Sequence, residues 1–236
     1  MREILFLIVL FVSNVIQAIT GFAGTVLAMP PSVYLLGLSH AKVVLNAMAW
    51  ISGLMIAATG YKHINWKELA KMSGFMLVGM AAGVQVCRVV KSEEILLSIY
   101  GVVIIAVALK NLCTHSEKKL PPAVLGVILL LAGIIHGMFV SGGALLVIYA
   151  TQVLKDKEEF RATVAPVWVV LNSVLIFTQV QSGAIGQADI RRILISILPL
   201  LAATWIGKKL VKKVSQKVFL NLTYVLLLIS GVSLIV

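Results

Sequence analysis

NVIQAITGFAG at Asn14–Gly24 and GIIHGMFVSGG at Gly133–Gly143 are related Gly-rich stretches, one in each half of the chain. When they are aligned, Gln17 matches His136, and Gly24 matches Gly143. Glycines clustered in this way interrupt a helix, because they weaken its backbone and allow sharp turns. We therefore expect a break in a helix at the same place in both halves.

Short apolar runs follow both breaks, at Thr25–Leu38 and at Ala144–Leu154. The second run has 11 residues and would measure about 16 Å as a helix, at 1.5 Å per residue. That length is too short to cross a hydrocarbon core of about 30 Å. Each half is therefore predicted to contain a re-entrant or broken helix hairpin.

The composition places the whole chain in a membrane. Of its 236 residues 60% are hydrophobic and 12% are charged, whereas soluble domains average about 25% charged residues. Several stretches without Asp, Glu, Lys or Arg approach the roughly 20 residues of a membrane-spanning helix. These stretches are Ile4–Ile19, Val43–Gly60, Ser73–Val86, Ile95–Leu109, Ala123–Ile135, Ala162–Val180, Ile193–Ile206 and Val218–Val236. The sequence thus predicts an all-α integral membrane protein with many spans.

A second pair of similar segments supports an internal duplication. GVQVCRVVKSEEILLSIY ends at Tyr100, and GKKLVKKVSQKVFLNLTY ends at Tyr224. We predict a first membrane repeat over residues 1–112, a polar linker over 113–122 and a second repeat over 123–236. Each repeat would hold one broken hairpin and three transmembrane helices. Because the number of spans is odd, the two repeats would be inverted, a plan common among transporters.

The basic residues predict the orientation of this arrangement. Of the 20 Lys and Arg residues, only six fall on one predicted side: Arg2, Lys42, Arg88, Lys91, Arg191 and Arg192. The richer side is expected to face the cytoplasm, so both termini would lie outside it, in a multi-pass protein of the cell membrane. The net charge of +11 is expected to serve this orientation and not nucleic-acid binding. Met1–Leu10 lacks a clear cleavage site and is not expected to be a signal peptide.

Broken helices at membrane depth predict a site for an anion. Irregular backbone is tolerated there only where it lies in protein or lines a wet cavity. The first N–H groups of the short helices lack intrahelical partners, and the positive helix end favours negative charge. The predicted substrate-binding residues are Gln17, Thr20, Gly21, Phe22, Gly24, Asn46, His136, Ser141, Gly142, Gly143, Thr163 and Asn172. The alternative is that these residues serve only helix packing and interhelical hydrogen bonds, the role expected for Trp50 and Trp168.

The remaining polar residues exclude other kinds of site. All nine acidic residues fall in predicted loops or at the N-terminus, which argues against a cation path or a carboxylate proton relay. His136 titrates near neutrality and is the first candidate if transport is coupled to protons. Without such coupling, the membrane potential would drive an anion outward. Cys87 and Cys113 lack metal-binding spacing, so neither a metal nor a cofactor is expected.

Three segments of the chain resemble a known family. GFAGTVLAMP at Gly21–Pro30, YKHINWKEL and HGMFVSGGALLVIY resemble motifs of the sulfite exporter TauE/SafE family of membrane permeases. The resemblance implies transport of sulfite, sulfonates or related small organic anions. It places the site at Gly21, Phe22, Gly24, Ser141, Gly142 and Gly143. The chain departs from the family pattern at Ala23 and Thr25, where glycine is frequent, and at Tyr149, where proline is usual.

The expected function is therefore secondary transport of a small anion by alternating access of the two repeats, with export favoured. An anion channel and a non-transporting membrane scaffold subunit are the alternatives. An enzyme is not expected, because His136 and Ser141 lack a third group that would orient them. The expected partners are the anion, the lipid bilayer and further copies of the chain in a homo-oligomer, without nucleic acid.

Overall fold

The structure is a computed structural model that describes residues 2–90, 92–113, 120–154 and 156–211, with a few isolated positions beyond. Every regular element in these ranges is a helix. The helices are α1 (Arg2–Thr20), α2 (Ala23–Leu36), α3 (Leu38–Gly60), the 3-10 turn η1 (Tyr61–His63), α4 (Trp66–Val89), α5 (Glu93–Cys113), α6 (Pro122–Phe139), α7 (Gly143–Val153), α8 (Lys157–Gln181) and α9 (Gln187–Leu210). Most of the predicted linker and the predicted span Val218–Val236 lie outside the described residues.

Six of the described helices are long and apolar enough to cross a membrane: α1, α3, α4, α6, α8 and α9. The chain is thus a multi-pass, all-helical membrane protein. The predicted short runs are confirmed as short helices, with 14 residues in α2 and 11 in α7. α2 ends two residues earlier than predicted because Gly37 adopts a φ of 83° and turns the chain into α3.

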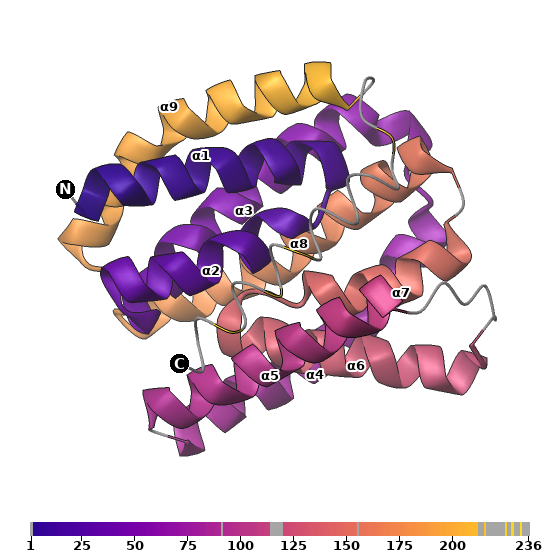
Figure 1. Cartoon of the computed structure of the whole chain (residues 1–236), viewed down its shortest axis with the longest axis horizontal. Coiled ribbons are helices and arrows are strands. Elements are labelled where there is room, and N and C mark those ends of the chain that lie inside the picture. The colour runs from indigo at the N-terminus through magenta and orange to yellow at the C-terminus, as the bar shows by residue number, and fades with distance from the viewer. Residues whose placement is uncertain are drawn as a thin grey trace.

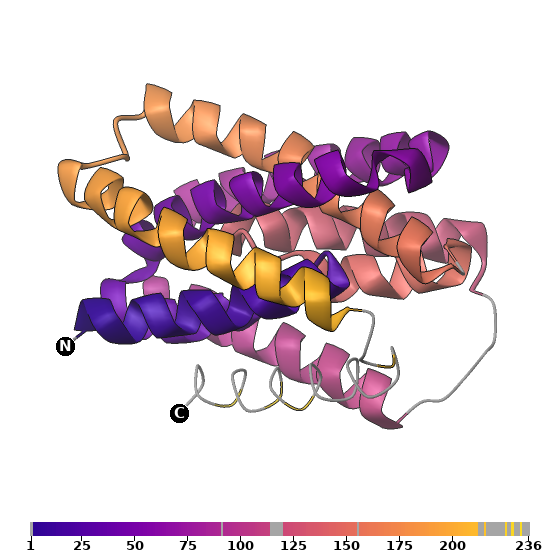
Figure 2. The ribbon, with the colours of Figure 1, turned by 90° about the horizontal axis from the view of Figure 1, so that it is seen from above.

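The helices run roughly parallel to the long axis of the molecule (Figure 1). α3 and α8 pack against each other in the middle, α1 packs on α9, and α4 packs on α6. α1 and α2 form an antiparallel pair that begins at one end of the molecule, and α6 and α7 form another that begins at the opposite end. The view from above places α9 along α1 (Figure 2).

Glycines bring α4 and α6 into backbone contact. Gly79 and Gly83 on α4 face Gly133 and Gly137 on α6, and a Cβ atom at any of the four would clash with a carbonyl oxygen of the other helix. Small residues four positions apart allow this close approach between helices in membranes. α1 and α9 approach similarly, since a Cβ on Gly207 would lie 2.5 Å from the Cβ of Ala18.

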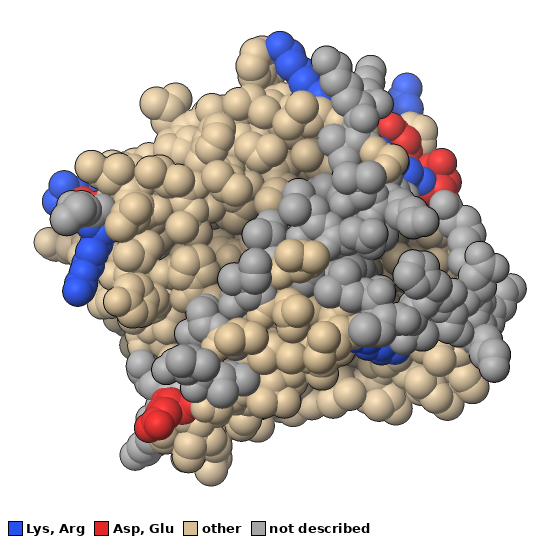
Figure 3. Space-filling model, in the orientation of Figure 1, with Lys and Arg blue, Asp and Glu red and all other residues tan. Residues whose placement is uncertain are grey.

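Polar contacts gather at the two ends of the bundle. At the first end, where α1, α3 and α9 begin, Asp189 accepts a hydrogen bond from His40 at 2.8 Å and one from Arg192 at 3.3 Å. At the second end, where α4, α6 and α8 begin, Asn65 caps α4 by accepting the N–H of Glu68, and Asp156 caps α8 by accepting the N–H of Glu159. On the face drawn in Figure 3, most of the visible charged side chains among the described residues lie toward these ends.

Candidate functional site

The first break lies between α1 and α2, and side chains of its own half occupy its backbone donors. Gly21 takes a φ of 84°, a conformation that only glycine adopts without strain. The N–H of Gly24 donates to Oε1 of Gln17 at 2.7 Å, and the N–H of Ala23 donates to Oγ1 of Thr20 at 3.4 Å. The first two amides of α2 are therefore already hydrogen-bonded.

The second break lies between α6 and α7, and here the backbone donors stay open. Val140 ends α6 in the left-handed conformation, with a φ of 55°. No described side chain caps α7, and its first backbone hydrogen bond is donated by Leu146 to Gly142 at 3.1 Å. The N–H groups of Gly143, Ala144 and Leu145 thus have no acceptor among the described residues. They form the positive end of the helix.

The side chain of Ser141, in the second break, is held by a hydrogen bond from α5. Its hydroxyl accepts a hydrogen bond from the Tyr100 hydroxyl at 2.6 Å. The ring of Tyr100 stacks on Phe139, with centroids 4.5 Å apart. α5 thereby supports the second break through an aromatic side chain that the sequence reasoning did not single out.

The two breaks touch each other. A Cβ atom on Gly143 would lie 2.7 Å from the carbonyl oxygen of Phe22 and 3.4 Å from its ring. Trp168 on α8 joins both sides of the contact: its indole N–H donates to the carbonyl of Gly21 at 2.7 Å, and its ring stacks on His136 at 5.3 Å. Trp168 thus does more than the packing expected of it. The available signal was that a buried indole N–H needs an acceptor.

Buried polar side chains extend from the breaks along the α3–α8 interface. His136 Nε2 pairs with Oδ1 of Asn172 at 2.8 Å, and Nδ2 of Asn46 donates to Oε1 of Gln179 at 2.9 Å. His136 Nδ1, Asn172 Nδ2 and Asn46 Oδ1 are buried without a partner in the described part of the chain. Unpaired buried polar atoms are costly, and three of them near the breaks are what a ligand site would leave.

Thr163 lies apart from this group. Its hydroxyl accepts the backbone N–H of Asn65 at 2.9 Å, and Nδ2 of Asn65 also donates to Glu159 at 2.9 Å. Thr163 therefore ties the α3–α4 connection to α8 at the second end. Of the predicted site residues, the structure brings together Gln17, Thr20, Gly21, Phe22, Gly24, His136, Ser141, Gly142, Gly143 and Asn172 around the breaks. Asn46 bonds instead to Gln179 across the α3–α8 interface.

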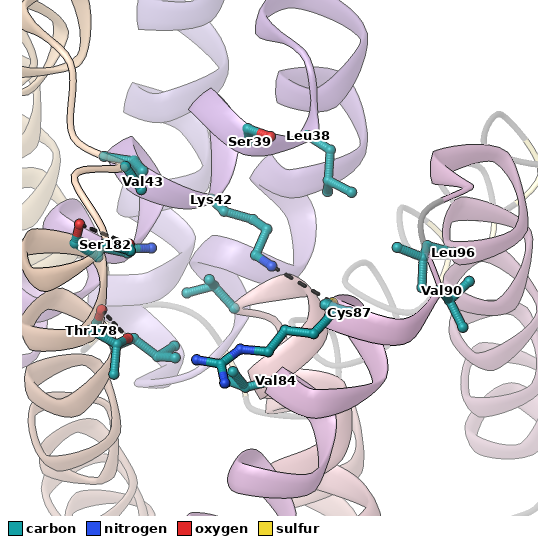
Figure 4. Close-up of a pocket in the computed structure, with 16 residues that line it drawn as sticks. Leu38, Ser39, Lys42, Val43, Val84, Cys87, Val90, Leu96, Thr178 and Ser182 are labelled. Carbon is teal, nitrogen blue, oxygen red and sulfur yellow. Dashed lines mark hydrogen bonds between the residues drawn. The ribbon is translucent and has the colours of Figure 1, made fainter.

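A cavity of about 460 Å³ connects the first end of the bundle to the second break. We call it the vestibule. Lys42 on α3 and Arg88 on α4 line it, Gln179 lies on its wall, and Gly137 and Val140 lie at its inner limit. No acidic residue is among its described lining residues. Figure 4 shows Lys42 pointing across it toward Cys87. The sequence reasoning did not single out Lys42, Arg88 or Gln179 as site residues.

Comparison with known proteins gives one match. The family model described as sulfite exporter TauE/SafE matches residues 5–234, nearly the whole chain. No curated protein and no solved structure matches the chain.

Proposed function

The chain belongs to the sulfite exporter TauE/SafE family of membrane transporters, and on that premise we propose that it is a secondary transporter of a small anion such as sulfite or a sulfonate. The solute would bind where the two glycine breaks meet. It would be carried by alternating access of two inverted repeats, residues 1–112 and 123–236. Export from the cell is the favoured direction.

The uncapped start of α7 carries this proposal. The open N–H groups belong to Gly143, Ala144 and Leu145, and the first of these residues packs against Phe22 of the other break. Oriented amides and the positive helix end stabilise an anion without a full positive charge at the site. Asn172, with its free Nδ2, adds a side-chain donor close by. Gln17 and Thr20 would act indirectly, by holding the first break in shape.

The pairing of the helices supports the inverted repeats. α1 packs on α9 as α6 packs on α4, and α3 packs on α8, which is the pattern that two equivalent halves related by a two-fold axis would make. The hairpins α1–α2 and α6–α7 also begin at opposite ends (Figure 1). Relative motion of such halves is the usual basis of alternating access.

The vestibule fits a conformation open at one end only. At the second end, Asn65 is bonded to Glu159 and Thr163, and the Tyr149 hydroxyl donates to Glu68 at 2.6 Å. These contacts join the first half to the second and would have to break for the site to open there. By the distribution of basic residues, the second end would face the cytoplasm and the vestibule the outside of the cell membrane.

His136 supports coupling of anion movement to a proton. When its Nε2–H donates to Asn172, its Nδ1 is an unpaired acceptor. A proton taken up at Nδ1 would place a positive charge beside the bound anion. If the proton and the anion then left the site together, their charges would cancel.

Flux through purified protein in proteoliposomes tests the proposal. Sulfite, sulfate, short sulfonates and carboxylates are offered in turn, and a saturable flux of at least one of them is expected. Gly143→Ala should abolish that flux, because the added methyl group displaces Phe22. Gly74→Ala is the matched control, since a Cβ at Gly74 meets nothing within 4 Å. Flux that never saturates would indicate a channel, and absence of flux for every anion would indicate a scaffold.

A further inference from the structure

No described carboxylate pairs with either cation of the vestibule. Nζ of Lys42 has one described contact, with Sγ of Cys87 at 3.9 Å, and Arg88 has no hydrogen bond or ion pair in the described part of the chain. Charged side chains at membrane depth or in membrane cavities are usually paired. The pair Lys42 and Arg88 therefore leaves a positive potential inside the vestibule.

Two described carboxylates at this end are paired elsewhere, and a third, Glu94 at the start of α5, is exposed and is not among the lining residues of the vestibule. Asp189 is fully buried and is paired with His40 and Arg192. Glu3 is paired with Arg191 on the outer surface at 3.9 Å. Neither carboxylate lines the vestibule. The described lining therefore supplies no negative charge that could pair with Lys42 and Arg88.

The walls of the vestibule are partly polar and partly apolar. Ser39 and Gln179 add polar groups beside the cations, while Val84, Val90 and Leu96 form an apolar wall. The volume of about 460 Å³ falls in the range of roughly 300–1,000 Å³ that small-molecule sites have. An oxyanion of four or five heavy atoms would occupy only part of it, which leaves room for water or for a short carbon chain.

The hydrogen bond between Asn46 and Gln179 lies at the wall of the vestibule. Gln179 lines the vestibule, whereas Asn46 is fully buried behind it. We propose that the vestibule is an outer anion-binding site, in which Lys42 and Arg88 hold the oxyanion head of the solute on one side of the Asn46–Gln179 bond. This site rests on the proposed function for its purpose, but its binding is measurable without transport.

An outer site of this kind has a kinetic consequence. Positive potential in a cleft with low-dielectric walls raises the local concentration of anions and speeds their association, by about tenfold or more. The effect falls as salt screens it, over a Debye length of about 8 Å at physiological ionic strength. Neutralising the cations should therefore raise KM, most strongly at low salt, and leave the maximal rate close to that of the unmodified protein.

Cys87 provides a reporter inside the vestibule. With Cys113→Ala as background, Cys87 is the only remaining cysteine. Detergent-solubilised protein is treated with 2-sulfonatoethyl methanethiosulfonate or with its trimethylammonium counterpart. We expect the anionic reagent to react about tenfold faster, and ethanesulfonate to protect the thiol. K42Q and R88Q should remove both the preference and the protection, whereas R191Q, at the same end but outside the vestibule, should keep them.

The same experiment separates a soluble anion from a lipid head group, which carries similar chemistry. Protection by ethanesulfonate in detergent, and in vesicles of phosphatidylcholine, supports the outer site. Protection by phosphatidylglycerol vesicles alone, without any effect of ethanesulfonate, would assign the cations to lipid and overturn the proposal.

Transport measurements distinguish this proposal from the proposed function. K42Q combined with R88Q should raise KM about tenfold at low salt with a maximal rate within twofold of the parent. Unchanged labelling and unchanged KM in that variant, with flux intact, would reject the outer site and leave the transporter assignment standing. Protection of Cys87 without flux of any anion would reject the transporter assignment and leave the outer site standing.

Discussion

The first glycine break uses its own side chains to accept two of its backbone N–H groups, whereas no described side chain does so at the second. Gln17 and Thr20 accept the leading amides of α2, and α7 starts without any described cap. The two breaks align in sequence, yet His136, the counterpart of Gln17, bonds to Asn172 instead of to its own break. The two aligned segments thus differ, one with capped donors and one with open donors, which would make the proposed anion site asymmetric.

The two breaks should differ most in the stability that the protein loses when a methyl group is added to each of them. At Gly142 a Cβ would clash with the carbonyl oxygen of Ala132, which is backbone and has no room to move. At Gly24 it would lie 2.7 Å from the Cβ of Gln17, a smaller overlap that a small shift of α1 against α2 can relieve. We expect Gly142→Ala to cost about 3 kcal/mol of stability and Gly24→Ala about half as much. Thermal unfolding in detergent measures both, and equal losses would remove the distinction.

The next largest loss of stability is expected at Gly21, the residue of the first break that has a positive φ. Gly21→Ala should cost about 2 kcal/mol, because it adds left-handed strain to a contact of 3.1 Å with the carbonyl of Arg161. Gly183 has a φ of 66° but meets nothing within 4 Å, so Gly183→Ala isolates the strain and should cost about 1 kcal/mol. Unfolding midpoints that rank the two variants in the opposite order would contradict the crowding at Gly21.

The bridge between the breaks is tested by Trp168→Phe. The ring can still stack on His136, but the buried carbonyl of Gly21 loses its indole donor. We expect a loss of about 1.5 kcal/mol together with a slower flux. Trp66→Phe serves as the control, because Trp66 is 66% exposed. A Trp168→Phe protein that transports at the full rate would show that the breaks need no link through α8.

The smallest effect is expected from Tyr100→Phe at the second break. The variant removes the hydroxyl that donates to Ser141 and retains the stacking on Phe139. Because the Ser141 hydroxyl loses only a bond that it accepts and keeps its own O–H to donate, the cost should be about 1 kcal/mol or less. Tyr34→Phe, at a residue that is 88% exposed, should leave the unfolding midpoint unchanged. A larger loss for Tyr100 than for Trp168 would place the main support of the site on α5.

The sequence predicted the helical membrane fold and the two breaks because both depend on local composition. Runs without charge give the long helices, and Gly21, Gly142 and Gly143 mark where a helix stops. The positions of α2 and α7 were correct to within two residues. The short length of α7 also followed directly from its count of apolar residues.

Contacts between distant segments could not be read from local composition. Trp168 reaches Gly21 across 147 positions, and Lys42 meets Cys87 across 45, so nothing near either residue indicates its partner. Thr163 was assigned to the wrong place for the same reason. Its polarity within an apolar span suggested the central site, but its hydroxyl accepts from Asn65 at the second end.

The amide resonance of Gly143 tests the central claim most directly. Protein labelled with ¹⁵N-glycine is titrated with the anion that the flux assay selects, and glycine-to-alanine variants at exposed positions assist the assignment. Saturable shifts at Gly143 and Gly142, with those of Gly74 and Gly183 unmoved, are predicted. Binding that leaves the resonances of both break glycines in place would contradict an anion site at the start of α7.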